Sequence, residues 1–166
     1  MKTLIGRLVD EIKKNKLTFA KKPLLIGGMA MEYYDLRKSG DDIDLVICNE
    51  DYQRLAAQYP EKRKDIWGDL GVVIGLFEIW RSINLLDYEF YIKDAIEEDC
   101  VFVVSIDKLL LMRVFAMDIK KYMDDLLLLK DYFYKIYKNI DYEQYQFVHI
   151  DSYKQSGTVF GGKYIN

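Results

Sequence analysis

The chain of 166 residues is 51% hydrophobic and 31% charged, and it carries a net charge of −3. This composition excludes a disordered chain and is sufficient for one compact core, so we expect a single domain over residues 1–166. The negative charge argues against broad binding to nucleic acid through its phosphates. No apolar run approaches the length of a membrane span, and the start of the chain lacks the apolar core of a signal peptide. We therefore expect a cytoplasmic protein with no membrane contact.

Helices and strands alternate in the first part of the predicted fold. Leu4, Leu8 and Ile12 recur at helical spacing, which predicts an amphipathic helix over the first sixteen residues. Capping and chain-breaking residues predict where the later elements begin and end. The predicted elements that follow are a strand over Leu24–Ile26, a helix over Ala30–Leu36, a strand over Asp42–Cys48 and a helix from Asn49 to near Pro60.

The second part of the chain is richer in β-branched and aromatic residues. Two strands, Val72–Trp80 and Ile83–Tyr91, are predicted there, with a turn at residues 81–82. A short strand over Cys100–Val104 and a helix from Asp107 to about Tyr137 follow. The fold class is therefore α+β, with a small mixed β-sheet flanked by helices and with helices at the C-terminal end. We expect a core over about 23–132 and a helical and irregular extension over about 133–166.

Two acidic residues stand two positions apart on the strand predicted over residues 42–48. Asp42 and Asp44 therefore project from the same face, while the residues between and beyond them point into the core. Two neighbouring carboxylates repel each other unless a cation is present, and they suit Mg²⁺ together with substrate phosphates. Acids also alternate with apolar residues on ordinary half-buried strands. The preceding turn, Gly27-Gly28, favours a nucleotide site, because a glycine backbone permits close approach of a phosphate.

This order of residues resembles the DNA polymerase β-like nucleotidyltransferase superfamily, and within it the small bacterial minimal and abortive-infection types. The family signature is a hydrophobic strand, a glycine pair, a helix, a polar link and then Asp-hydrophobic-Asp. The resemblance covers about Pro23–Tyr132, strongly at the front and loosely behind. The matching residues are Gly27 and Gly28 in the turn, Arg37 and Ser39 in the link, and Asp42 and Asp44 on the strand.

The resemblance implies an enzyme that moves a nucleoside monophosphate from an NTP to a hydroxyl acceptor, which is a small molecule, tRNA or protein. It implies that Asp42 and Asp44 hold Mg²⁺ or Mn²⁺. It also implies that the backbone of Gly27 and Gly28, with the Arg37 and Ser39 side chains, binds the phosphates. The acceptor itself is not identified by the resemblance.

The third carboxylate of the family lacks a clear counterpart. Within Ile83–Asp87, Asn84 stands where that acid is expected, and an amide carries no charge and is no general base. A bulge in the strand would instead bring Asp87 into the site as the third catalytic acid. Two other interpretations stay open beside an active enzyme. One is a catalytically weakened nucleotide-binding or partner-binding module, and the other is the toxin or antitoxin of a phage-defence pair with a protein partner.

Overall fold

The computed structural model describes residues 3–136, and the chain divides into two compact units, Met1–Leu128 and Leu129–Asn166. The helices are α1 (Leu4–Lys14), α2 (Gly27–Tyr33), α3 (Asn49–Gln58), a 3-10 turn η1 (Pro60–Lys62), α4 (Tyr88–Tyr91), α5 (Ile106–Phe115) and α6 (Lys120–Ile136). The strands are β1 (Leu24–Leu25), β2 (Ile43–Val46), β3 (Arg63–Ile66), β4 (Asp69–Ile74), β5 (Phe77–Trp80), β6 (Ser82–Ile83), β7 (Leu86–Asp87), β8 (Ile96–Glu97) and β9 (Phe102–Val103).

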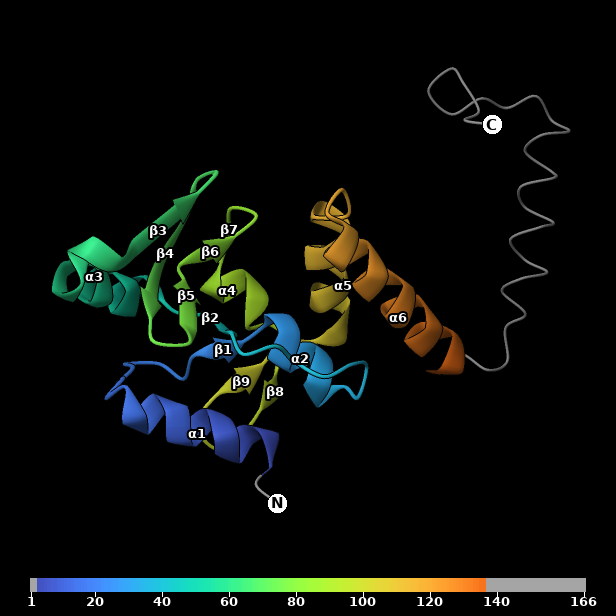
Figure 1. Ribbon diagram of the computed structural model, residues 1–166, viewed down its shortest axis with the longest axis horizontal. Coiled ribbons are helices and arrows are strands. Elements are labelled where there is room, and N and C mark those ends of the chain that lie inside the picture. The colour runs from blue at the N-terminus through green and yellow to red at the C-terminus, as the bar shows by residue number, and fades with distance from the viewer. Residues whose placement is uncertain (1–2, 137–166) are drawn as a thin grey trace, which may run out of the picture. The chain divides into compact units, whose positions relative to one another are not determined.

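The first unit is built on a seven-stranded mixed sheet in the order β3-β4-β5-β2-β1-β9-β8 (Figure 1). Strand β2 is central, pairing antiparallel with β1 and parallel with β5. Strands β6 and β7 form a separate two-stranded sheet. The mixed α+β class expected from the sequence is confirmed. No helix within residues 3–136 is long and apolar enough to cross a membrane.

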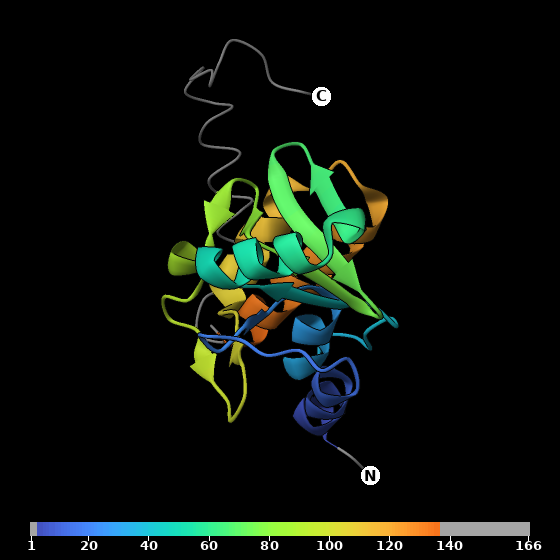
Figure 2. The ribbon, with the colours of Figure 1, turned by 90° about the vertical axis from the view of Figure 1, so that its left-hand side faces the viewer.

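The central strands carry the apolar side chains of the core. Leu45 and Val46 on β2 and Ile79 on β5 are almost completely removed from solvent. Helix α2 packs on β2, and α1 packs on α2 (Figure 2). Helix α1 begins as its amphipathic pattern predicts, with Thr3 accepting a hydrogen bond from the Gly6 amide at 3.0 Å. This arrangement fixes the loop between β1 and α2 beside β2.

Two of the predicted strands are wrong. The run predicted as one strand over Val72–Trp80 is a hairpin, because the chain reverses after Ile74, with Gly75 at a φ of 59°. The run predicted as one strand over Ile83–Tyr91 is instead a hairpin of two short strands, β6 and β7, followed by α4. Asp87 ends that strand, since its side chain accepts a hydrogen bond from the Phe90 amide at 3.0 Å and so begins a helix. Strand β3 was not predicted.

The helix predicted from Asp107 to about Tyr137 is two helices. Helix α5 ends at Phe115, where bonds from the Ala116 and Met117 amides to carbonyls three residues back tighten the last turn. Helix α6 then starts at Lys120 and includes residues 133–136 of the expected extension. The rest of that extension, residues 137–166, lies outside the described residues.

Candidate functional site

The glycine turn lies directly against the acid-bearing strand. Gly27 opens α2 with a φ of 65°, a conformation that side chains disfavour. A Cβ atom on Gly27 would lie 2.0 Å from Asp44 Oδ2, so only glycine leaves room for this carboxylate. The Ile26 amide also donates to the Asp44 carbonyl at 3.0 Å. The turn and Asp44 therefore pack directly against each other.

Asp44 is the most perturbed acid of this group. Burial, followed by the charges of Asp42 and Glu78, raises the pKa of Asp44 to about 6. Asp42 lies one residue before β2 and is exposed, yet its charge acts on Asp44. Arg113 and Lys121 act in the opposite direction and lower the pKa of Asp44. A half-buried carboxylate that two other carboxylates repel is a group that a bound cation would stabilise.

Glu78 is the acidic residue that the sequence analysis missed. It lies on β5 directly opposite Asp44 in the parallel β2–β5 pair, so both side chains project from the same face of the sheet. Lys64 on β3 holds it, with the lysine Nζ 2.7 Å from Glu78 Oε1. The sequence around Glu78 does carry a signal for a half-buried strand, because the apolar residues Phe77 and Ile79 flank Glu78 and both are buried. The same apolar-acid-apolar alternation surrounds Asp44.

Asp44 and Glu78 open into a cavity of about 350 Å³, which Asp42 does not line. Its polar and charged lining residues come from six different elements and loops. They are Asp44, Lys64, Asp69, Glu78, Asn84 and Arg113, together with Gly27 of the glycine turn. Both tryptophans of the chain, Trp67 and Trp80, line it as well.

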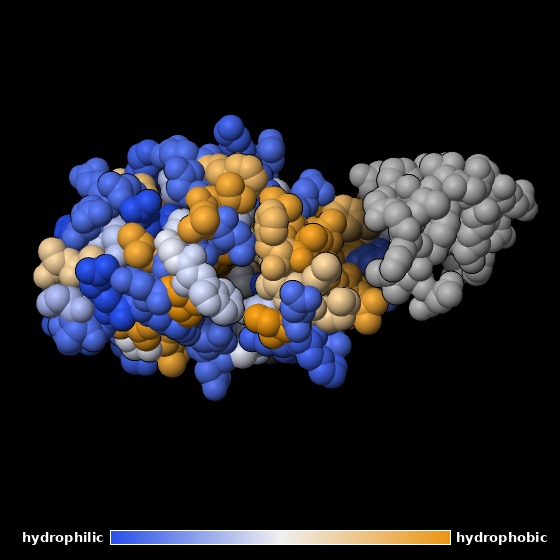
Figure 3. All heavy atoms as spheres, turned by 90° about the horizontal axis from the view of Figure 1, so that it is seen from above, coloured by the Kyte–Doolittle hydropathy of each residue, from blue (hydrophilic) through white to orange (hydrophobic). Residues whose placement is uncertain are grey.

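The helical side of the molecule near this cavity is apolar. Figure 3 shows apolar side chains gathered on the surface over α5 and the start of α6. Phe115, Met117 and Ile119 are large exposed residues of this region, and Ile119 also lines the cavity. A charged interior with a partly apolar surround suits a ligand that joins a charged group to an apolar or planar one.

The two link residues that the resemblance places on phosphates have protein partners. Arg37 donates to both carboxylate oxygens of Asp125, from Nε at 2.5 Å and from Nη2 at 3.1 Å. Ser39 donates to Glu32 from its hydroxyl at 2.5 Å and from its amide at 3.0 Å. These bonds from Ser39, aided by Lys38 and Arg7, lower the pKa of Glu32 to about 2. Arg37 and Ser39 thus order the link before Asp42.

Gly28 and Arg37 are neighbours in space. A Cβ atom on Gly28 would lie 3.6 Å from Arg37 Nη1, which is an ordinary van der Waals distance. Gly28 is therefore not required by the packing of the turn in the way that Gly27 is. The guanidinium of Arg37 does lie beside the turn, as the phosphate-binding hypothesis requires.

Asn84 and Asp87 lie in different places. Asn84 lines the cavity with Asp44, and its backbone N–H donates to Asp69 Oδ2 at 2.7 Å. Asp87 caps α4 and lines a separate cavity beside Cys48 and Arg81. The structure does not bring Asp87 to Asp44, and the carboxylate next to Asp44 is Glu78.

The donor set fits a hard cation that keeps water or substrate oxygens as ligands. Within residues 3–136, no three His, Cys, Asp or Glu side chains form a complete metal-binding group. Mg²⁺ does not need one, since it binds proteins through one or two carboxylates and completes its shell with water and phosphate. Asp42, Asp44 and Glu78 are the residues that would hold it.

No protein-family model, no curated protein and no solved structure matches the chain. The functional assignment therefore rests on the residues of the cavity.

Proposed function

We propose that this protein is a Mg²⁺-dependent nucleotidyltransferase with an NTP as its donor substrate. The observation that supports the proposal is that Gly27, Asp44 and Glu78, from three neighbouring elements, line one cavity. A glycine backbone beside paired carboxylates offers phosphates a close approach and offers their cation its ligands. The resemblance of residues 23–132 to DNA polymerase β-like enzymes points to the same chemistry.

In this mechanism, Asp42, Asp44 and Glu78 would hold Mg²⁺ or Mn²⁺, and the cation would supply positive charge against the charge that develops on the phosphates. The acceptor oxygen forms a bond to the α-phosphorus. The bond from that phosphorus to the oxygen bridging to the β-phosphate breaks, and pyrophosphate leaves with the electron pair. We assign the acceptor's proton to Glu78, because the Asp44 carboxylate packs against Gly27.

A nucleotide-binding module without transfer is the second candidate. It is favoured by Asn84, which lines the cavity with Asp44 and presents an uncharged amide where the resemblance places the third acid. The acceptor class and a role in a toxin–antitoxin pair are proposals that depend on the resemblance alone. The cytoplasmic location is a proposal that depends on the hydropathy of the sequence.

Tryptophan fluorescence separates binding from transfer, because both tryptophans line the cavity. We expect at least one of ATP, CTP, GTP and UTP to change the emission when Mg²⁺ is present, and EDTA to reverse the change. Incubation with the corresponding [α-³²P]NTP and either tRNA, a protein extract or a small-molecule extract should label an acceptor. Binding without labelling of any fraction would favour the second candidate. Absence of both signals would contradict the proposal.

A further inference from the structure

Arg113 is a buried cation that is poorly matched by its surroundings. Its residue is 6% exposed, which is unusual for arginine. The guanidinium carbon lies 4.7 Å from the centre of the Tyr122 ring, so one face is covered by an aromatic side chain. Nε lies 2.9 Å from Asp125 Oδ2, yet it is a buried atom that has no hydrogen-bond partner among the described residues. An arginine has five N–H donors, and burying them unbonded is costly.

The carboxylate of Asp125 does not pair with Arg113 alone, because it also pairs with Arg37. Its two oxygens already accept the hydrogen bonds of the Arg37 guanidinium. Asp125 is itself buried, at 1% exposure. Two guanidinium groups therefore share one carboxylate, and Nε of Arg113 is left without a hydrogen-bond partner among the described residues. Such a buried donor favours an additional acceptor in the cavity.

Arg113 also lines the cavity that contains Asp44 and Glu78. The positive charge of Arg113 is felt in that cavity, because it lowers the pKa of Asp44. A bare anion entering there would be repelled by the two carboxylates. An anion that arrives with a divalent cation satisfies both sides, because the cation faces the acids and the anion faces the arginine.

We propose that Arg113 binds the phosphate chain of a Mg²⁺-bound nucleoside triphosphate by donating hydrogen bonds to its non-bridging oxygens. The inference rests on the proposed function and adds a residue from α5 to that site. Guanidinium and phosphate match in geometry and charge, and their bonds are among the strong ones in proteins. Asp125 then acts as a positioning residue that holds Arg113 at the cavity and also pairs with Arg37.

The test compares full-length Arg113→Met and Arg113→Lys with the wild type. Arg113→Met removes the charge, and Asp125 keeps its two bonds from Arg37, so we expect the variant to fold. Arg113→Lys keeps the positive charge but lacks the planar guanidinium group, which can donate two parallel hydrogen bonds. Arg63→Met is the matched control, because Arg63 pairs with Asp65 on the exposed side of β3 and does not line the cavity. Thermal melts without ligand establish that each variant is folded.

Tryptophan fluorescence and thermal shift are then measured with Mg²⁺ and ATP, inorganic tripolyphosphate, AMP or adenosine. For ATP and tripolyphosphate we expect Arg113→Met to raise Kd by about tenfold to a hundredfold, Arg113→Lys to raise it less, and Arg63→Met to leave it unchanged. Adenosine should show no dependence on Arg113. Omission of Mg²⁺ should abolish polyphosphate binding, because the carboxylates then repel it.

The outcomes separate this inference from the proposed function. Unchanged Kd values for ATP in both Arg113 variants would overturn the inference and leave the nucleotidyltransferase proposal in place. Arg113-dependent binding of ATP without labelling of any acceptor would support the inference and count against transfer. If neither tripolyphosphate nor any of the four NTPs binds to the wild type, both are overturned. If Arg113→Met does not fold, an unchanged Kd for ATP and tripolyphosphate in Arg113→Lys still overturns the role of the guanidinium group.

Discussion

Asp44 is held in the fold at a cost in stability. Its pKa rises from 3.8 to about 6, chiefly by burial, so the folded state binds its proton more tightly than the unfolded state does. The resulting stabilisation is complete below the unfolded pKa and is lost as the pH rises through the folded pKa. Above pH 6, the ionised carboxylate opposes folding until a cation binds. Such a cost is typical of functional residues rather than of residues selected for packing.

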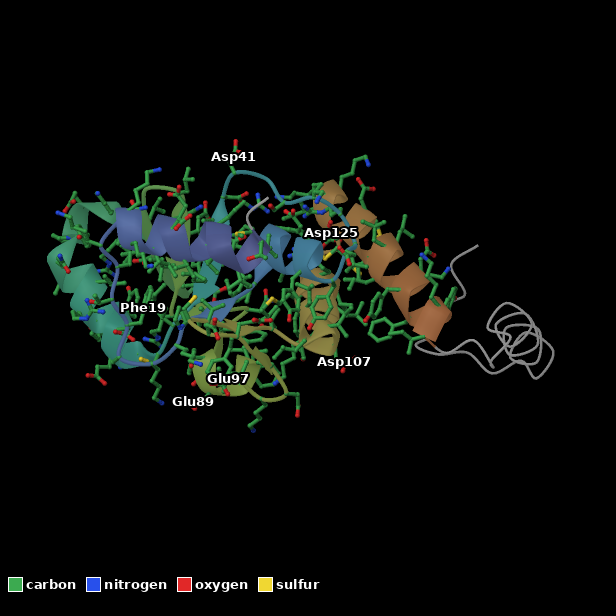
Figure 4. All side chains as sticks on the ribbon, turned by 90° about the horizontal axis from the view of Figure 1, so that it is seen from below. Phe19, Asp41, Glu89, Glu97, Asp107 and Asp125 are labelled. Atoms are coloured by element: carbon green, nitrogen blue, oxygen red, sulfur yellow. The ribbon has the colours of Figure 1, made fainter. Side chains whose placement is uncertain are left out.

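Asp44→Asn should therefore stabilise the protein while it removes Mg²⁺-dependent nucleotide binding. We expect the free energy of unfolding at pH 7, without ligand, to rise by about 1–3 kcal/mol. The wild type should lose stability relative to the variant between pH 3.8 and about 6, the window of the Asp44 titration. Urea denaturation across this pH range measures both effects. Asp41→Asn is the control, since Asp41 is exposed and points away from the protein (Figure 4). A variant less stable than the wild type at pH 7 would contradict the account of Asp44.

The two glycines of the turn should respond differently to alanine. Gly27→Ala places a Cβ 2.0 Å from Asp44 Oδ2 at a φ that disfavours side chains, so we expect a loss of about 1–3 kcal/mol and of Mg²⁺–NTP binding. Gly28→Ala meets nothing closer than 3.6 Å and lies in a helix, where alanine is favoured, so its melting temperature should stay near that of the wild type. Thermal melts with and without Mg²⁺–NTP distinguish the two. Equal melting temperatures for both variants would count against the packing of Asp44 on Gly27.

At the level of the strands, the proposed site takes its third acid from β5, whereas the sequence placed that acid on the β6–β7 hairpin. Glu78→Gln keeps a hydrogen-bond acceptor for Lys64 and removes the charge, so we expect labelling of the acceptor to fall at least about a hundredfold with little change in stability. Asp87→Asn should retain both labelling and fold, because asparagine also caps helices. Asn84→Asp should not raise the activity of a site that already has its third acid. Loss of labelling in Asp87→Asn, with Glu78→Gln active, would restore the bulge hypothesis.

The link between α2 and β2 is ordered from α2 by Glu32. Glu32→Gln weakens the bonds to the Ser39 amide and hydroxyl and to Arg7 and Lys38, so we expect a loss of about 1–2 kcal/mol at pH 7. The pKa of Glu32 falls from 4.5 to about 2, so its stabilisation is present above pH 4.5 and is lost as the pH falls through 2. Urea denaturation at pH 7 and pH 2 measures this. Glu11→Gln, which breaks a surface pair with Lys14, is the control and should change little.

The same elements explain how far the sequence alone predicts this site. Strands β1 and β2 were predicted because Leu24–Ile26 and Asp42–Cys48 carry clear apolar patterns, and the glycine turn lies between them in the chain. Glu78 was missed because residues 72–80 have the composition of one strand, and the reversal inside it depends on the backbone conformation of Gly75. Arg113 and Asp125 are twelve positions apart, which is about 18 Å along a continuous helix. Only the break between α5 and α6 brings them together.

At the level of the whole molecule, the net charge of −3 does not favour polyphosphate binding in general. Any affinity for NTP must then come from the local arrangement of Mg²⁺ ligands, backbone and Arg113, and it should require the cation. Nucleotide binding of this kind is specific to the folded state, so it should shift the unfolding equilibrium of the full chain by mass action.

We therefore expect Mg²⁺ with the preferred NTP at about a hundred times its Kd to stabilise the protein by about 2.7 kcal/mol. For a chain of this size, that corresponds to a rise in melting temperature of about 5–10 °C. NTP without Mg²⁺ should have almost no effect, because the phosphates then face Asp44 and Glu78 without an intervening cation. Differential scanning fluorimetry with each of the four NTPs, with and without EDTA, measures the shift. A shift that persists in EDTA, or one that Asp44→Asn retains, would show that nucleotides stabilise this protein somewhere other than at the carboxylates of β2 and β5.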